Sequence, residues 1–146
     1  MNGLERFLTA SSLTLAVLFT GAAAQAMPIP QFKEMAPTVQ ANYINALVQN
    51  AETALARDHS RDRSADIDKV RQFFDKSNVG AERFFLALAL MQVDDAKNRV
   101  ENPNYEWSDA ADAMVLALQK FGVELPDNFF TLAKDLDTKF PPPEKH

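Results

Sequence analysis

The sequence contains no cysteine and few histidines and glycines, and each shortage excludes a kind of chemistry. Without cysteine there is no disulfide, no thiolate zinc site and no lipid-modified N-terminal cysteine. His59 lies in a charged stretch and His146 is the last residue, so neither adjoins a structured serine as the base of a catalytic triad must. We therefore expect no catalytic residues, no metal and no cofactor.

Positive charge is also in short supply. The chain has 15 lysines and arginines against 20 aspartates and glutamates, which gives a formal net charge of −5. Binding to nucleic acid or to an anionic membrane requires clustered basic residues, whereas the two signs are interspersed here. The sequence also lacks a glycine-rich phosphate loop. We therefore expect neither nucleic acid nor an anionic membrane as a partner.

Long apolar runs are confined to two places, and the first is the N-terminus. Arg6 precedes a predominantly apolar segment, Phe7 to Ala24, and Ala24-Gln25-Ala26 matches the small-residue pattern of a leader cleavage site. This combination predicts a signal peptide over 1–26, cleavage after Ala26 and export to the periplasm or the exterior. An uncleaved membrane anchor is the alternative. The hydroxyl residues within the run disfavour it, so we expect no stable membrane span after cleavage.

The second apolar run is Phe84 to Val93, which only Gln92 interrupts. Its first eight residues are all apolar, and at 100° per residue they point to every side of a helix. This predicts a helix over 81–100 that is buried on all sides at this run. The run is too short to cross a bilayer, which needs roughly 20 residues.

Four more helices are predicted from apolar residues spaced three and four positions apart. The five predicted helices cover 38–57, 64–76, 81–100, 108–121 and 126–140. Sustained period-2 alternation is absent, and Gly80 and Gly122 are the only glycines beyond position 26, so hairpins are not expected. The predicted fold is all-α: a single compact bundle of about five helices around a buried central helix.

Proline marks both ends of this predicted bundle. Pro28, Pro30 and Pro37 fix φ and disfavour helix in the preceding residues, so 27–37 is predicted to be an extended lead-in. The bundle over 38–140 has a common domain size. Prolines begin the segment 141–146, which is predicted to be a disordered tail.

Oxygen-bearing side chains occupy every second position from Asp58 to Asp66, the rhythm of an EF-hand calcium loop. Arg63 stands where that loop needs glycine, and Lys69 stands where it needs a bidentate glutamate. The pattern therefore favours a solvated linker, with Ser64 capping the following helix, over a calcium site.

Acidic residues also gather near Trp107, and an aromatic ring beside carboxylates is one ingredient of a carbohydrate-hydrolysing cleft. Asp109 and Asp112, however, fall in the first turn of a predicted helix, where acidic groups complement the helix dipole. An enzyme with a carboxylate-only active site is therefore the least favoured of the functions considered.

The sequence is rich in phenylalanine, with eleven residues, and adjacent phenylalanines on a helix point 100° apart. One of each pair is thus available for a surface contact. We expect an exported, non-catalytic protein–protein interaction module that presents Phe129, Phe130 and Trp107 to an unknown protein partner.

The alternative function is that of a carrier for a small apolar ligand. The ligand would occupy a cavity between helices, near the large apolar residues of the central and following helices. These residues are Phe84, Leu88, Met91 and Met114.

Overall fold

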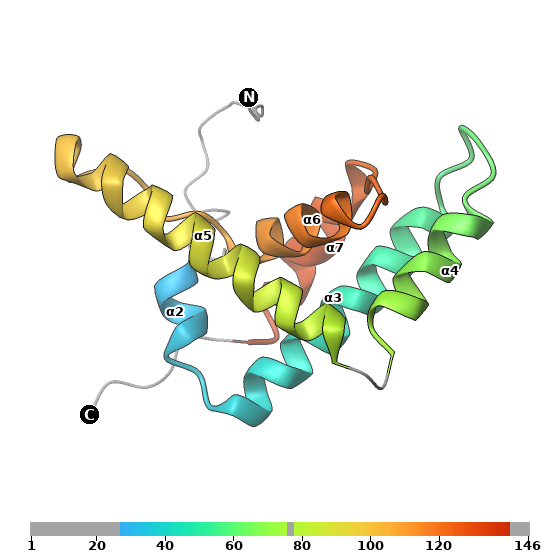
Figure 1. Cartoon of the computed structure of the whole chain (residues 1–146), viewed down its shortest axis with the longest axis horizontal. Helices are drawn as coiled ribbons and strands as arrows, with labels where there is room; N and C mark the ends of the chain where they lie inside the picture. The colour runs from blue at the N-terminus through green and yellow to red at the C-terminus, as the bar shows by residue number, and fades with distance from the viewer. Residues whose placement is uncertain (1–26, 76–77, 141–146) are drawn as a thin grey trace.

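The computed structural model describes residues 27–75 and 78–140, and every named element in these ranges is a helix (Figure 1). The helices are α2 (Ile29–Lys33), α3 (Pro37–Ala56), α4 (Ser64–Phe73), α5 (Val79–Glu101), α6 (Ala110–Lys120) and α7 (Asn128–Asp137). The structure confirms the all-α prediction. The predicted signal peptide over 1–26 and the predicted tail over 141–146 lie outside the described residues.

The sequence predicts an extended lead-in over 27–37. The structure differs, because Ile29–Lys33 forms the helix α2. Pro28 precedes this helix in an extended conformation, and Pro30 lies in its first turn, where a missing N–H costs nothing. Phe32 is fully buried, with its ring centroid 5.5 Å from that of Tyr43 on α3 and 5.8 Å from that of Phe84 on α5. Burial of this ring therefore outweighs the local bias of the prolines.

Helix α3 is the best-covered long helix, since it packs against α4, α6 and α7. Its inward face places seven residues in the core: Tyr43, Ile44, Leu47, Val48, Ala51, Ala54 and Leu55. Helix α5 has α6 as its main neighbour and crosses the body of the molecule, with its C-terminal end projecting (Figure 1). The core is thus organised around α3 rather than around α5.

The prediction that the apolar run of α5 is buried on all sides is wrong. Phe84, Ala87 and Leu88 are buried, but Leu86 and Leu90 are exposed. The reason is coverage: α6, the main neighbour of α5, has 11 residues against 23 in α5, so much of the longer helix remains open. Among the described helices, none is both long and apolar enough to cross a bilayer.

The C-terminus of α6, at Lys120, lies one residue before the end of the helix predicted over 108–121. Gly122 adopts a positive φ of 93°, a conformation that favours glycine. The N–H of Val123 donates to the carbonyl of Leu118 at 2.9 Å, and that of Gly122 donates to Gln119 at 3.1 Å. This is a Schellman motif, in which Val123 also contributes to the core.

Gly80 lies where the end of α4 meets the start of α5, and it permits a close approach of the two backbones. A Cβ atom at Gly80 would lie 2.6 Å from Cδ1 of Phe74 and would also strike the carbonyl of Phe73. Because the carbonyl belongs to the backbone, it cannot move aside without shifting α4.

Substitution of Gly80 by alanine is therefore expected to destabilise the protein, by about 1–3 kcal/mol as for other overpacked sites. Urea denaturation followed by circular dichroism measures the change. Glycine-to-alanine changes within helices ordinarily stabilise by about 0.5–1 kcal/mol, so the sign of the effect is informative. An unchanged or more stable Gly80→Ala variant would contradict the close packing of α4 on α5.

Candidate functional site

Apolar residues on the exposed side of α5 recur every seven positions. Val79, Leu86, Val93 and Val100 are 44%, 50%, 57% and 83% exposed, and Leu90, one turn beyond Leu86, is 51% exposed. Apolar residues that repeat every 3.5 positions on average line one stripe of a helix, the pattern by which one helix packs along another. We call these five residues the α5 stripe.

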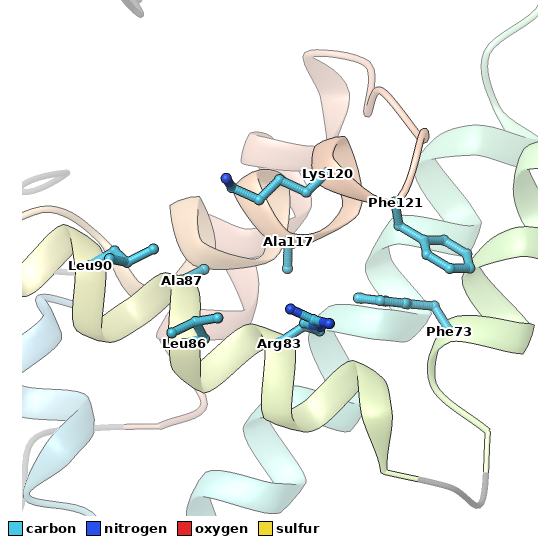
Figure 2. Close-up of a pocket in the computed structure, with 8 residues that line it drawn as sticks. All are labelled: Phe73, Arg83, Leu86, Ala87, Leu90, Ala117, Lys120 and Phe121. Carbon is cyan, nitrogen blue, oxygen red and sulfur yellow. The ribbon is translucent and has the colours of Figure 1, made fainter.

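A groove of about 350 Å³ lies beside the stripe, between α5 and α6 (Figure 2). We call it the α5–α6 groove, and its lining residues are Phe73, Arg83, Leu86, Ala87, Leu90, Ala117, Lys120 and Phe121. Leu86 and Leu90 belong to both features, so the groove and the stripe overlap at these two residues.

Small residues at the helix contact and rings at one end shape this groove. Ala87 on α5 and Ala117 on α6 are both buried, and neither side chain extends far from its helix. Phe73 and Phe121 face each other at one end of the groove, with ring centroids 4.4 Å apart (Figure 2). Leu90 lies at the opposite end. The resulting surface is mainly apolar and open to solvent.

Two basic side chains accompany the apolar lining. Arg83 extends from α5 toward Phe73, and Lys120 extends from α6 above Ala117 (Figure 2). The chain as a whole carries a net charge of −5, opposite in sign to this pair. The groove therefore combines apolar contact area with local positive charge, which suits an amphipathic ligand with acidic groups.

The residues predicted to line a ligand cavity belong mainly to the core. Phe84, Leu88 and Met114 are buried, and Met91 is partly buried against them. None of the four lines the α5–α6 groove. The hypothesis of a cavity around these residues stays a prediction.

The three residues predicted to form a partner surface differ in their exposure to solvent. Phe129 is buried in the core, whereas its neighbour Phe130 is 43% exposed on α7. Trp107 is half-buried, with the guanidinium of Arg99 at 4.8 Å from its ring centre. None of these residues lines the α5–α6 groove, and their role as a surface stays a prediction.

The loop that resembles an EF-hand is organised by Arg63, which is buried. Its guanidinium donates to Asp58 at 2.6 Å, to Asp66 at 2.8 Å and to the carbonyl of Glu124. Asp62 accepts hydrogen bonds from the backbone and hydroxyl of Ser64 at 3.0 and 2.7 Å. The predicted solvated linker is thus a structured one, and Ser64 is the first residue of α4 rather than its cap. The N-cap residue is Arg63, which makes no side-chain cap hydrogen bond, and Asp62 accepts from the N–H of Ser64.

Asp109 lies in a second groove of about 340 Å³, together with Trp107. Its carboxylate accepts hydrogen bonds from the backbone N–H groups of Met27 and Ala111, each at 2.9 Å. It therefore caps α6, which begins at Ala110, two residues after the predicted start at 108. Both of its oxygens are engaged with the backbone, which gives this residue a structural role.

Two further carboxyl groups, Asp112 and Asp137, interact electrostatically with Asp109, and we call the three the acidic cluster. Removal from water raises the pKa of Asp109. The same effect and the charge of Asp109 raise the pKa of Asp112 and of Asp137 to about 7. The hydroxyl of Tyr43 donates to Asp137 at 2.7 Å, and burial raises the pKa of this phenol.

The chain matches no protein-family model, no curated protein and no solved structure. Sequence reasoning missed the α5 stripe because it treated Phe84 to Val93 as one block, although the seven-residue spacing of Val79, Leu86, Val93 and Val100 is visible in the sequence.

The hydrogen bond from the Tyr43 hydroxyl to Asp137 is expected to stabilise the fold. Tyr43→Phe leaves the buried carboxyl of Asp137 without this donor, so we expect a loss of about 1–3 kcal/mol in the free energy of unfolding. Urea denaturation at about pH 7 measures it. Tyr105→Phe removes the hydroxyl of a loop tyrosine and serves as the matched control. Equal stability of the two variants would show that the Tyr43–Asp137 bond contributes nothing.

Proposed function

We propose that this protein is an exported, non-catalytic protein–protein interaction module that binds an acidic amphipathic helix of another protein. The binding surface is the α5 stripe together with the α5–α6 groove. The observation that carries the proposal is the exposed seven-residue repeat of apolar side chains on α5. Export rests on the leader pattern that ends at Ala26.

The exposure of this surface supports a binding role. Each Å² of apolar surface removed from water stabilises the folded state by roughly 25 cal/mol. Large apolar side chains that stay exposed do not contribute this stabilisation to the fold. Contiguous apolar patches on soluble proteins mark interaction sites. Leu86 and Leu90 are half-exposed beside a groove whose floor is already buried, and this arrangement favours a docking surface over incidental exposure.

The spacing of the stripe supports a helix as the occupant. Apolar anchors at positions i, i+4 and i+7, as in Leu86, Leu90 and Val93, match the way a helix packs along a helix or into a groove. The open groove beside the stripe, rimmed by Phe73 and Phe121, offers room for large side chains of such a partner.

The basic pair decides between an acidic partner and a second copy of this chain. A two-fold dimer through this surface would bring the same patch together with itself. Arg83 and Lys120 of the two copies would then approach each other, and like charges at an interface are unfavourable. An acidic helix instead meets these two cations with opposite charge.

The groove also supports one alternative, the carrier of a small apolar ligand. Its volume of about 350 Å³ falls at the lower end of the range for small-molecule sites. A ligand with an acidic head and an apolar tail suits its combination of leucines and cations. Native mass spectrometry of the purified protein distinguishes the two, since a carrier retains a bound small molecule.

Photo-crosslinking tests the proposed surface. A benzoylphenylalanine placed at Leu90 is expected to yield one protein adduct in the cells that express the chain, since this residue lies in the contact. The same group at Thr131, exposed on α7, is expected to yield none and is the control. Mass spectrometry of the adduct then locates the crosslink in the partner. Crosslinks to lipid, to a second copy or to nothing would each overturn the proposal.

Charge reversal tests the acidic character of the partner identified in this way. The double change Arg83→Glu and Lys120→Glu should weaken its binding by about tenfold or more, because two attractions become repulsions. Isothermal titration calorimetry measures the affinity. Arg57→Glu, at the exposed end of α3, changes a charge away from the groove and should leave affinity unaltered. Equal affinities for all forms would show that the partner does not rely on charge.

A further inference from the structure

The first described residue, Met27, is fixed in the interior of the molecule. It is 0% exposed, and its carbonyl accepts a hydrogen bond from the N–H of Ala110 at 2.8 Å. Two residues later, the N–H of Ile29 donates to the carbonyl of Ser108 at 3.1 Å. A short antiparallel bridge thus holds this segment against the start of α6.

The backbone nitrogen of Met27 points at carboxylates. Its N–H donates to Oδ2 of Asp109 at 2.9 Å. A hydrogen bond from the same backbone also favours the charged form of Asp137. The predicted leader cleavage falls at the peptide bond on this nitrogen, between Ala26 and Met27. The nitrogen that donates to Asp109 is therefore the same atom that the predicted cleavage would release as a free amine.

The acidic cluster lacks a close positive partner among the described residues. The cation that acts on Asp109 is Lys134, which is exposed on α7. From the other helices, Tyr43 on α3 and Asp95 on α5 interact with the cluster and supply no positive charge. Arg99 on α5 lines the same groove as Asp109, but its guanidinium donates to the carbonyl of Tyr105 and lies over the ring of Trp107. Burial of several carboxyl groups without a compensating charge is unfavourable.

We propose that cleavage after Ala26 turns the nitrogen of Met27 into a buried α-ammonium group that forms ion pairs with Asp109 and Asp137. Hydrolysis breaks the Ala26–Met27 peptide bond and consumes one water molecule. Ala26 receives the carboxylate, and Met27 receives an amine that takes up a proton at neutral pH. The amide nitrogen carries one hydrogen and no charge, whereas the ammonium carries three donors and a positive charge.

This arrangement makes the stability of the fold depend on accurate processing. One additional residue would place the charge up to about 3.5 Å further along the chain, away from Asp109. In the uncleaved chain, the cluster has only the amide of Met27 as its partner at this position. Removal of the leader thus gives the mature chain a stabilising interaction that the precursor lacks.

The pH dependence follows from the directions of the pKa shifts. A carboxyl group whose pKa is raised on folding contributes stability that is present below its unfolded pKa and is lost as pH rises through the folded value. For Asp112 and Asp137 this loss extends from about pH 4 to about pH 7. An adjacent ammonium favours the charged carboxylates and reduces the loss. Its own pKa rises, so its contribution ends only at alkaline pH.

Three forms of the mature chain test this proposal. The first begins at Met27 with a free amine and is released from a fusion by a protease that leaves no extra residue. The second is the same chain acetylated at Met27, and the third begins at Ala26. All three contain every described residue. At about pH 7 the free-amine form is expected to have an unfolding equilibrium constant at least about tenfold lower than the other two.

The pH profile and carboxylate variants sharpen the test. The advantage of the free amine should grow from about pH 4 to about pH 7 and vanish at alkaline pH. It should also vanish in Asp109→Asn with Asp137→Asn, in which asparagine keeps a good helix cap at 109. Asp135→Asn, exposed on α7, should preserve it. Equal stability of the three forms, or an advantage that survives the double variant, would overturn the proposal.

A measurement on the folded protein covers the case in which the double variant does not fold. Modification of the α-amine by an acylating reagent should be at least about tenfold slower in the native chain that begins at Met27 than in the same chain unfolded in urea. The chain that begins at Ala26 should react in its native form nearly as fast as when unfolded. Rapid native labelling of the Met27 amine would show that it is not buried in an ion pair.

Discussion

The contact on which the rest of this structure depends is the ring of Phe32 against Tyr43 and Phe84. It joins α2 to α3 and α5, two helices that otherwise have different main neighbours. Aromatic pairs at such separations contribute about 0.5–1.5 kcal/mol beyond the area they bury. Because Phe32 belongs to a helix of five residues, α2 depends on this tertiary contact rather than on its own propensity.

The sequence predicts those features that local spacing determines. The helix predicted over 38–57 is found over Pro37–Ala56, and the helix predicted to end at 121 ends at Lys120, shortly before Gly122 with its positive φ. Helix α2 was missed because three prolines dominate the local pattern, while the burial of Phe32 that stabilises it arises from residues distant in sequence. Local rules thus succeed where the interactions that decide the conformation are themselves local.

The candidate sites required information that spacing does not contain. Apolar residues on all sides of α5 indicate that burial is possible, but the number of neighbours decides which sides are covered, and α6 covers only a part. The stripe was readable as a seven-residue repeat, yet its exposure was not. The approach of Met27 to Asp109 joins positions 82 apart in the sequence, and no motif signals it.

The two proposed sites share a structural support. Phe85 of α5 packs against Phe32 with ring centroids 6.2 Å apart, and Lys33 donates to Gln92 of α5 at 2.9 Å. Helix α2 therefore flanks α5. It begins at Ile29, and only Pro28 separates it from Met27. The proposed ion pair at the Met27 nitrogen would anchor the start of α2, and α2 in turn contacts α5, the helix that carries the exposed Leu86 and Leu90. Loss of that anchor should then loosen the binding surface as well as the fold, because the same short helix links the two.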